Sequence, residues 1–185
     1  MILETKRLIL RPWKSSDAES MFQYACDPDI GPSAGWPAHK SVEESRNVIE
    51  TVLCGKEAYA VCLKEDNIAI GAIELKLFGH SNLARCTEEC ELGFWIGKPF
   101  WGRGLIPEAA GELLRHAFED LAMETVWCGY YDGNRKSERT QQKIGFRYHH
   151  TTKDADVPLL NEKRTEHINC KTKAQWEALH KEAES

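Results

Sequence analysis

The sequence lacks the features of a membrane or secreted protein. No apolar run approaches the roughly 20 residues that a membrane helix needs, and Met1–Trp13 contains neither a long apolar stretch nor a small-residue cleavage site. The net charge is −5 at neutral pH, whereas binding to nucleic-acid phosphates depends on clustered lysine and arginine. We therefore expect a cytoplasmic protein that binds neither membrane nor nucleic acid.

The seven cysteines include no CxxC pair and are scattered along the chain. This pattern is typical of reduced, mostly buried thiols in a cytosolic protein. His80, Cys86 and Cys90 form the one conceivable metal cluster, but their spacing does not match that of a zinc knuckle. No metal site is predicted.

The chain has no repeat, low-complexity tract or Pro/Gly/Ser-rich linker, so we expect one domain, residues 1–185, with one core. Apolar spacing and turn signals predict helices after 16 and 41 and at 107–121, 134–144 and 174–183. The expected strands are 7–11, 58–63, 68–77, 89–96, 125–130, 146–152 and 165–170. This order predicts an α+β layer sandwich around one mixed sheet.

Three helix starts are predicted from local signals. Capping boxes at Ser16–Glu19 and Ser41–Glu44 open the first two helices. Pro107 suits the first position of the third helix. The second helix is expected to carry a single apolar stripe of Val48, Ile49, Val52 and Leu53.

A strand, a turn with two glycines and a helix follow one another in the segment Glu91–Glu108. The first turn of a helix offers N–H groups without intrahelical partners, and Gly102 and Gly104 let the backbone curl around an anion. A pyrophosphate is the natural occupant. A Walker loop would need a Lys-Ser/Thr pair after its last glycine, and a dinucleotide fingerprint would need a glycine where Pro107 stands.

This run resembles the pyrophosphate-binding motif of the GCN5-related N-acetyltransferases (GNAT), in particular the branch of ribosomal-protein N-terminal acetyltransferases. Thr5–Arg11 resembles the first strand of that family, and Asn134-x-x-Ser137 with Lys143-x-Gly145-Phe146 resembles its second signature. The resemblance covers 5–146. It implies an α+β fold with a mixed, mostly antiparallel sheet of about seven strands and helices on both faces.

The resemblance also implies acetyl-CoA as co-substrate. The fourth strand would separate from the fifth near a bulge, and one freed N–H group would face the thioester oxygen. The residues expected to pair with the pantetheine arm are Phe94, Trp95 and Ile96. The residues expected to wrap the pyrophosphate are Trp101, Gly102, Arg103, Gly104, Leu105 and Ile106. Asn134 and Ser137 would contact the pantetheine and the thiol end, and Arg139 and Lys143 are candidates for the adenosine phosphates.

The sequence departs from the family pattern at two positions. Ile106 stands where most of the superfamily has Gly or Ala. Its larger side chain narrows the approach of the pyrophosphate to the turn but leaves the Ile106 N–H available to bind it. Gln141 stands where many relatives have a Tyr that protonates the leaving thiolate, so a phenolic acid is absent. Ser137 is then a candidate hydrogen-bond donor to the sulfur, although a hydroxyl in a first helical turn is often a capping group.

Glu91 is the predicted general base, because it lies on the strand face shared with Gly93 and Trp95; the alternative is an ordinary strand carboxylate. His80, Cys128, His149 and His150 show no base–nucleophile pairing, and no covalent intermediate is expected. The acceptor groove is expected at two loops over the sheet, around Trp36 and at Phe78–Arg85.

We therefore predict an enzyme that transfers acetyl from acetyl-CoA to an amine by direct attack in a ternary complex. The favoured acceptor is the N-terminal α-amino group of a ribosomal or other protein, which is partly neutral at cellular pH. The alternatives are a small amine (a polyamine, amino acid or antibiotic) and a non-catalytic CoA-binding regulatory module. Both a monomer and a homodimer remain open.

Overall fold

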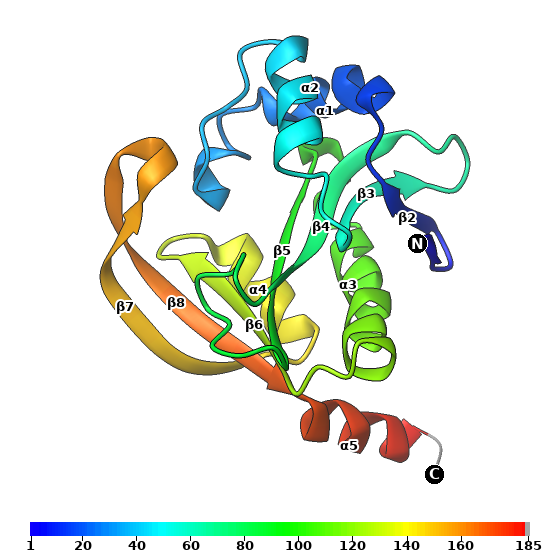
Figure 1. Cartoon of the computed structure of the whole chain (residues 1–185), viewed down its shortest axis with the longest axis vertical. Coiled ribbons are helices and arrows are strands. Elements are labelled where there is room, and N and C mark those ends of the chain that lie inside the picture. The colour runs from blue at the N-terminus through cyan, green and yellow to red at the C-terminus, as the bar shows by residue number, and fades with distance from the viewer. Residues whose placement is uncertain (184–185) are drawn as a thin grey trace.

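The computed structural model describes residues 1–183, which form one eight-stranded sheet flanked by helices (Figure 1). The strand order is β1-β2-β3-β4-β5-β6-β8-β7, and the β5–β6 pair is parallel while the other neighbours are antiparallel. The strands are β1 Leu3–Glu4, β2 Leu8–Pro12, β3 Ala58–Leu63, β4 Ala69–Leu77, β5 Glu89–Ile96, β6 Thr125–Tyr131, β7 Arg147–Val157 and β8 Glu162–Thr172. The predicted fold class is confirmed.

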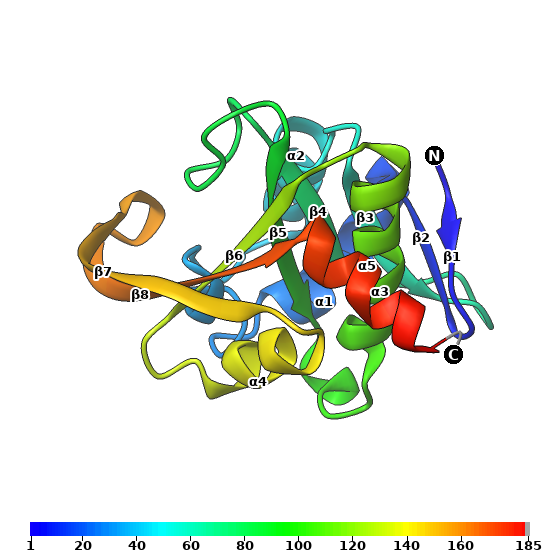
Figure 2. The same cartoon turned by 90° about the horizontal axis from the view of Figure 1, so that it is seen from below.

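Helices cover both faces of the sheet (Figures 1 and 2). They are α1 Ala18–Ala25, α2 Val42–Thr51, α3 Leu105–Arg115, α4 Arg135–Lys143 and α5 Lys173–Ala183. The α3 side holds the larger core, in which Leu92 and Ile96 of β5 are buried, while Trp95 of the same strand packs with α1 and α2 on the opposite side. The alternation predicted for β5 is therefore present, because successive strand residues point to opposite faces.

The first helix does not begin with the predicted Ser16 box. A 3-10 turn, Ser15–Asp17, precedes α1, and the carboxylate of Asp17 accepts the Lys14 N–H at 2.9 Å. The same carboxylate forms a nearly buried ion pair with Arg11 at 2.7 Å. Arg11 of β2, six positions before Asp17, therefore holds Asp17 in the turn, and the Ser16 capping-box pattern does not include it.

The second helix begins as predicted, with the Ser41 hydroxyl accepting the Glu44 N–H at 3.1 Å. Its apolar stripe is shorter than expected. Ile49 and Leu53 are buried, but Val52 is 64% exposed because the helix ends at Thr51 and the chain turns away there.

The third helix begins two residues before the predicted Pro107. Gly104 is its N-cap, so Pro107 occupies the third helical position. Proline is tolerated there because the N–H groups of the first turn have no intrahelical acceptor. The helix continues into a π-turn, His116–Asp120, close to the predicted end at Leu121.

The last two strands are longer than predicted, 147–157 and 162–172 instead of 146–152 and 165–170. Their outer halves are mostly exposed and polar, so they lack an apolar alternation. The β7–β8 hairpin extends from the body, and its tip lies on the side of the loop before α2 (Figure 1). Arg164 fixes this approach by donating to the Pro32 carbonyl at 2.5 Å.

Candidate active site

The two central parallel strands separate after three residue pairs, the last of which joins Glu91 to Trp127. β5 nevertheless continues to Ile96 and β6 to Tyr131. We call the opening between 92–96 of β5 and 128–131 of β6 the strand gap. The separation implied by the resemblance is confirmed, but β5 stays in unbroken register with β4, so the bulge expected beside it is not found in this strand.

Two peptide groups of β5 face the strand gap. Alternate residues of a strand direct their N–H and C=O groups to opposite neighbours, and the Gly97 N–H donates to a β4 carbonyl at 2.8 Å. Trp95 therefore belongs to the β4 ladder, and Phe94 and Ile96 turn toward the gap. The Ile96 carbonyl already accepts the Trp101 indole N–H at 2.9 Å. The predicted backbone contact thus has the right orientation at Phe94 and Ile96 but not at Trp95.

The turn after β5 is shaped by two glycines. Gly102 and Gly104 have φ angles of +73° and +72°, a left-handed conformation that costs other residues free energy. Leu105 and Ile106 open α3 with buried side chains, 1% and 6% exposed. Ile106 therefore packs into the core, and both residues face the turn with first-turn N–H groups, as in an anion site at a helix N-terminus.

Cationic side chains surround this turn. A Cβ placed on Gly104 would lie 3.8 Å from Arg7 Nη2 and 3.9 Å from Lys143 Nζ. Lys136 Nζ lies 3.6 Å from the centroid of the Trp101 ring. The structure thus brings Lys143 to the turn. Lys143 and Arg139 are both exposed, and their contact with the adenosine phosphates remains a prediction. Sequence reasoning missed Arg7 and Lys136, and no local pattern links Arg7 to a turn 96 residues away.

Glu108 fastens Arg7 to the turn. Its carboxylate accepts the Arg7 Nε at 2.6 Å and the Thr5 hydroxyl at 2.6 Å, while Arg7 Nη1 donates to the Arg103 carbonyl at 3.0 Å. Burial opposes ionisation of Glu108, but the hydrogen bonds from Thr5 and Arg7 outweigh it and hold its pKa below the ordinary value. A charged Glu108 therefore orients the guanidinium beside Gly104.

The predicted Asn134 ends the loop before α4. Its Oδ1 accepts the Ser137 N–H at 3.1 Å, and its Nδ2 donates to the Ser33 carbonyl at 3.1 Å. Asn134 therefore caps the helix and ties it to the loop before α2. Contact with a pantetheine arm remains a prediction for this residue.

Ser137 is oriented by Gln141, which is completely buried. Gln141 Nε2 donates to the Gly129 carbonyl at 3.0 Å and to Ser137 Oγ at 3.1 Å, and its Oε1 accepts Asn169 Nδ2 at 2.7 Å. A backbone carbonyl can only accept, so the orientation of this amide is settled. The Ser137 oxygen is then an acceptor toward Gln141, and its own hydrogen is directed elsewhere.

On the face of the sheet that Trp95 shares with α1 and α2, Glu91 is held by two partners. Its Oε1 lies 3.3 Å from Lys76 Nζ, and its Oε2 accepts the Ser81 hydroxyl at 2.8 Å. Ser81 Oγ in turn accepts the N–H groups of Leu83 and Ala84 at 2.9 Å each, so Glu91 organises the loop that was expected to bind the acceptor. Its role as base stays a prediction.

Aromatic rings form another part of this face. The predicted Trp36 meets Trp95 edge to face, with ring centroids 5.8 Å apart, and lies 5.2 Å from the ring of His39. Tyr131 of β6 lies beneath the Arg164 guanidinium at 5.3 Å. The loop before α2 and the β7–β8 hairpin thus meet over the strand gap.

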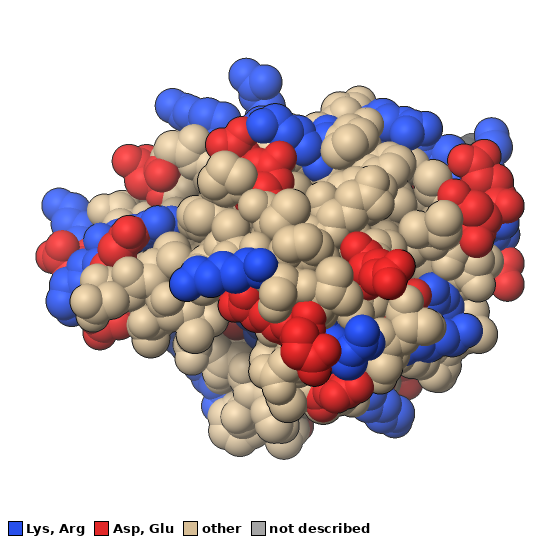
Figure 3. All heavy atoms as spheres, turned by 90° about the horizontal axis from the view of Figure 1, so that it is seen from above, with Lys and Arg blue, Asp and Glu red and all other residues tan. Residues whose placement is uncertain are grey.

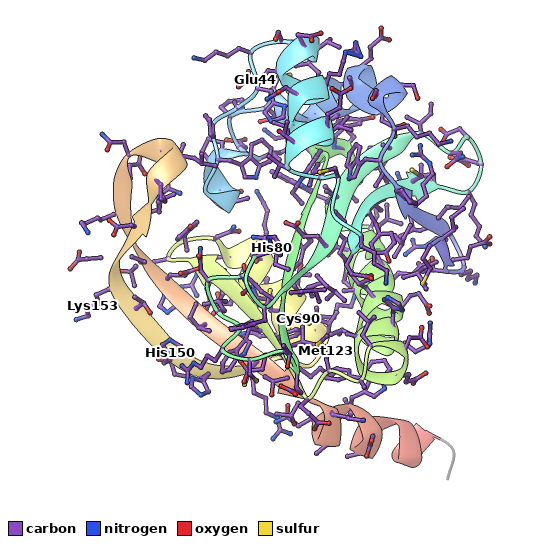
Figure 4. All side chains as sticks on the ribbon, in the orientation of Figure 1. Glu44, His80, Cys90, Met123, His150 and Lys153 are labelled. Carbon is purple, nitrogen blue, oxygen red and sulfur yellow. The ribbon has the colours of Figure 1, made fainter. Side chains whose placement is uncertain are left out.

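The other nucleophile and metal candidates do not assemble. His80, Cys90 and His150 come from different elements and lie apart (Figure 4). Among the described side chains, residues 1–179, no three His, Cys, Asp or Glu groups are placed so as to hold a metal ion. Cys128 is buried, and burial raises its pKa well above the ordinary value, so its thiolate is disfavoured.

The face bearing α1 and α2 mixes charges of both signs with uncharged surface, and its described residues form no continuous basic area (Figure 3). In the described part of the chain, no helix combines the length and apolarity needed to cross a membrane.

An anion-binding helix start beside a parallel strand pair that separates is what the resemblance implies for a CoA-dependent N-acetyltransferase. The chain matches the family model described as "Acetyltransferase (GNAT) domain" over residues 7–147, and it belongs to this family. The predicted enzyme class, a GNAT acyltransferase, is confirmed.

Relatives and solved structures agree with this family. The Bacillus subtilis protein named "Putative ribosomal N-acetyltransferase YdaF" is 38% identical over 65 residues, which cover 35% of this chain and 36% of that protein. A GNAT acetyltransferase from Bacillus anthracis matches with a TM-score of 0.81 at 23% identity, over 94% of this chain and 99% of that one. Ribosomal-protein-S5-alanine acetyltransferase from Vibrio fischeri matches with a TM-score of 0.70 at 18% identity, over 95% and 98%.

Proposed function

We propose that this protein transfers the acetyl group of acetyl-CoA directly to an amine, with the N-terminal α-amino group of a protein as the favoured acceptor. The observation that carries the proposal is the strand gap, which opens beside the glycine turn at the start of α3. Unpaired peptide groups suit an amide-bearing arm, and the turn suits a diphosphate.

Different residues would bind the diphosphate and the pantetheine arm of acetyl-CoA. The N–H groups of Leu105 and Ile106, with Arg7 and Lys143, would neutralise the diphosphate. The Phe94 and Ile96 peptides would align the pantetheine arm, and an N–H from this pair would stabilise the developing charge on the thioester oxygen. A fixed donor of this kind acts most strongly when water is excluded from the site.

Ser137 would donate a hydrogen bond to the departing sulfur. Its oxygen is held by Gln141, so the hydroxyl hydrogen is available to the thiolate that forms when the C–S bond breaks. Gln141 itself has both amide hydrogens engaged and cannot supply a proton. This arrangement replaces the phenolic acid that the family pattern would place at the same position.

The acceptor would approach from the face that carries Trp36, Trp95 and the carboxylates of Glu91 and Glu166. Acidic side chains beside aromatic rings attract a protonated amine. Relatives named as ribosomal-protein acetyltransferases support a protein α-amino group as the acceptor. A small amine would satisfy the same charges.

Two measurements test the proposal. Calorimetry should detect binding of CoA and acetyl-CoA to the pure protein; no binding at millimolar concentrations would overturn it. A thiol-release assay with acetyl-CoA should then give free CoA with peptides that carry a free N-terminus. Release with small amines alone would change the acceptor, and binding without release from any acceptor would indicate a regulatory module.

A further inference from the structure

Glu166 of β8 differs from the other two carboxylates near the strand gap. Glu91 is engaged by Lys76 and Ser81, and Glu74 lies 3.8 Å from Lys76 Nζ. Among the side chains of 1–179, none forms a hydrogen bond or ion pair with the Glu166 carboxylate, although the residue is partly buried. A partly buried carboxylate without a partner is costly, and such groups are concentrated at functional sites.

The Glu166 carboxylate lies over Gly129. A Cβ at Gly129 would come within 2.5 Å of Glu166 Oε1, so no other residue fits there without displacing the carboxylate. Gly129 is the second residue of β6 after its last pairing with β5, which sets it at the strand gap. The absence of a side chain at this residue therefore lets the carboxylate reach the opening.

The same glycine connects Glu166 with the predicted sulfur site. The Gly129 carbonyl accepts Gln141 Nε2 at 3.0 Å, and that amide also donates to Ser137 Oγ at 3.1 Å. One short piece of β6 is thus contacted by a free carboxylate and, through Gln141, by the hydroxyl group. Amine acetylation needs a proton acceptor for the amine and a donor for the sulfur, close to one carbonyl carbon.

The charges around Glu166 favour a basic carboxylate. Burial, and then repulsion from Glu91, raise its pKa, and Lys76 offsets part of this rise. Tyr131 and Cys128 of β6 also lie within its electrostatic reach, and burial raises the pKa of both, so they stay neutral near pH 7. Glu166 is therefore a stronger base than an ordinary surface glutamate while keeping its charge available to an ammonium group.

We propose that Glu166 is the catalytic base: its carboxylate binds the protonated acceptor amine over Gly129 and removes one proton. This inference rests on the proposed function. The neutral amine then forms the C–N bond to the thioester carbon as the C–S bond breaks. The nitrogen then loses a second proton, and the thiolate gains one and leaves as the thiol. Glu166 afterwards releases its proton to water. Glu91, which Lys76 holds in place, contributes to the basicity of Glu166 by repulsion.

The test compares Glu166→Gln with Glu91→Gln and with Glu74→Gln, the matched control that removes a neighbouring charge. We expect E166Q to lower kcat/KM for the amine by about 100-fold, E91Q to lower it less, and E74Q to change it by less than about threefold. CoA affinity, measured by calorimetry, should stay at the wild-type value in all three. Equal losses in E166Q and E74Q would overturn the assignment, because charge alone would then explain them.

The pH profile gives a readout that a structural role would not move. With an acceptor whose own pKa lies below the assay range, the wild-type kcat/KM should fall on the acid side at a pH above the ordinary glutamate range, and E166Q should lack this limb. Glu166→Asp should retain the limb and recover part of the rate. A limb that persists in E166Q and disappears in E91Q would assign the base to Glu91. If the wild-type protein fails to bind CoA, the proposed function itself fails.

Discussion

The two sides of the strand gap are built in different ways. The proposed cofactor side consists mainly of one continuous segment, Phe94–Glu108, in which strand, turn and helix start follow within a few residues. The proposed acceptor side draws its groups from four strands and two loops, including Glu91 of β5 and Glu166 of β8. The first is a local structure, and the second exists only after the sheet has assembled.

This difference has a consequence for specificity. A diphosphate can be bound by backbone N–H groups, which every residue except proline supplies, so a short motif is sufficient. An acceptor amine must be recognised by side chains at defined positions, and these positions come from distant parts of the chain. Substitutions should therefore separate the two functions cleanly, with changes in CoA affinity on one side and changes in acceptor kinetics on the other.

The largest effect is expected from Gly104→Val. A β-branched residue at φ +72° is strained, and its methyl groups would enter the space between Arg7 and Lys143. The dissociation constant of CoA, measured by calorimetry, should rise by about 100-fold, a loss of about 2.7 kcal/mol.

Gly111→Ala is the matched control for this variant. A Cβ at Gly111 meets nothing within 4 Å, and the residue lies inside α3. We expect unchanged CoA affinity and a gain in unfolding free energy of up to about 1 kcal/mol. Wild-type affinity in G104V would show that the anion binds elsewhere.

Ser137→Ala tests the proposed hydrogen-bond donor to the sulfur, which lies where the cofactor and acceptor sides meet. Loss of the donor to the sulfur should lower kcat by roughly 10- to 100-fold and leave the CoA dissociation constant unchanged. Because Gln141 acts through Ser137, Gln141→Leu should lower kcat in the wild-type background but not further in S137A. If S137A mainly weakened CoA binding or folding, Ser137 would have a structural role alone.

Arg7→Met should weaken CoA binding by about tenfold, because Arg7 contributes a charge beside Gly104 and fastens the Arg103 carbonyl. The acceptor KM should not change. Lys6→Met, a neighbouring exposed lysine, is the control and should bind CoA like the wild type. Equal loss in both variants would indicate a long-range effect of net charge, which added salt would remove.

Trp36→Ala should act on the acceptor side alone. We expect the Trp36 ring, which packs on Trp95, to offer the acceptor an aromatic contact of about 0.5 to 1.5 kcal/mol, so the acceptor KM should rise about three- to tenfold without it. Tyr148→Ala, which removes a ring that is 65% exposed on the hairpin, should leave KM unchanged. A change in CoA affinity in W36A would contradict the separation of the two sides.

The smallest effect is expected from Glu108→Gln. The folded-state pKa of Glu108 is lowered, so its contribution is full above the unfolded-state pKa of about 4.3 and is lost as the pH falls through the folded value. Urea unfolding should show E108Q about 1 kcal/mol less stable near pH 7, and the two proteins should converge in acid. If the difference in unfolding free energy between the two proteins persisted at low pH, the packing of the Glu108 side chain, and not its charge, would hold Arg7 in place.

The elements with strong local signals were predicted well. The Ser41 cap, the alternation of β5 and the glycine turn all depend on residues within one or two turns of each other, and the structure contains them. The prediction was wrong at the start of the first helix, where Asp17, paired with Arg11 of β2, and not Ser16, accepts the Lys14 N–H. It also fell short on β7 and β8, whose exposed polar halves lack an apolar pattern.

The sequence by itself determined the conformation of the glycine turn, because φ angles near +70° and free N–H groups at a helix start follow from a few adjacent residues. Only the tertiary structure decided which side chains surround it and which carboxylate remains free. Arg7 reaches the turn from the first hairpin, and Glu166 reaches Gly129 across the β6–β8 pair. The register of the sheet determines both contacts. This register depends on the packing of the whole core and not on any local motif.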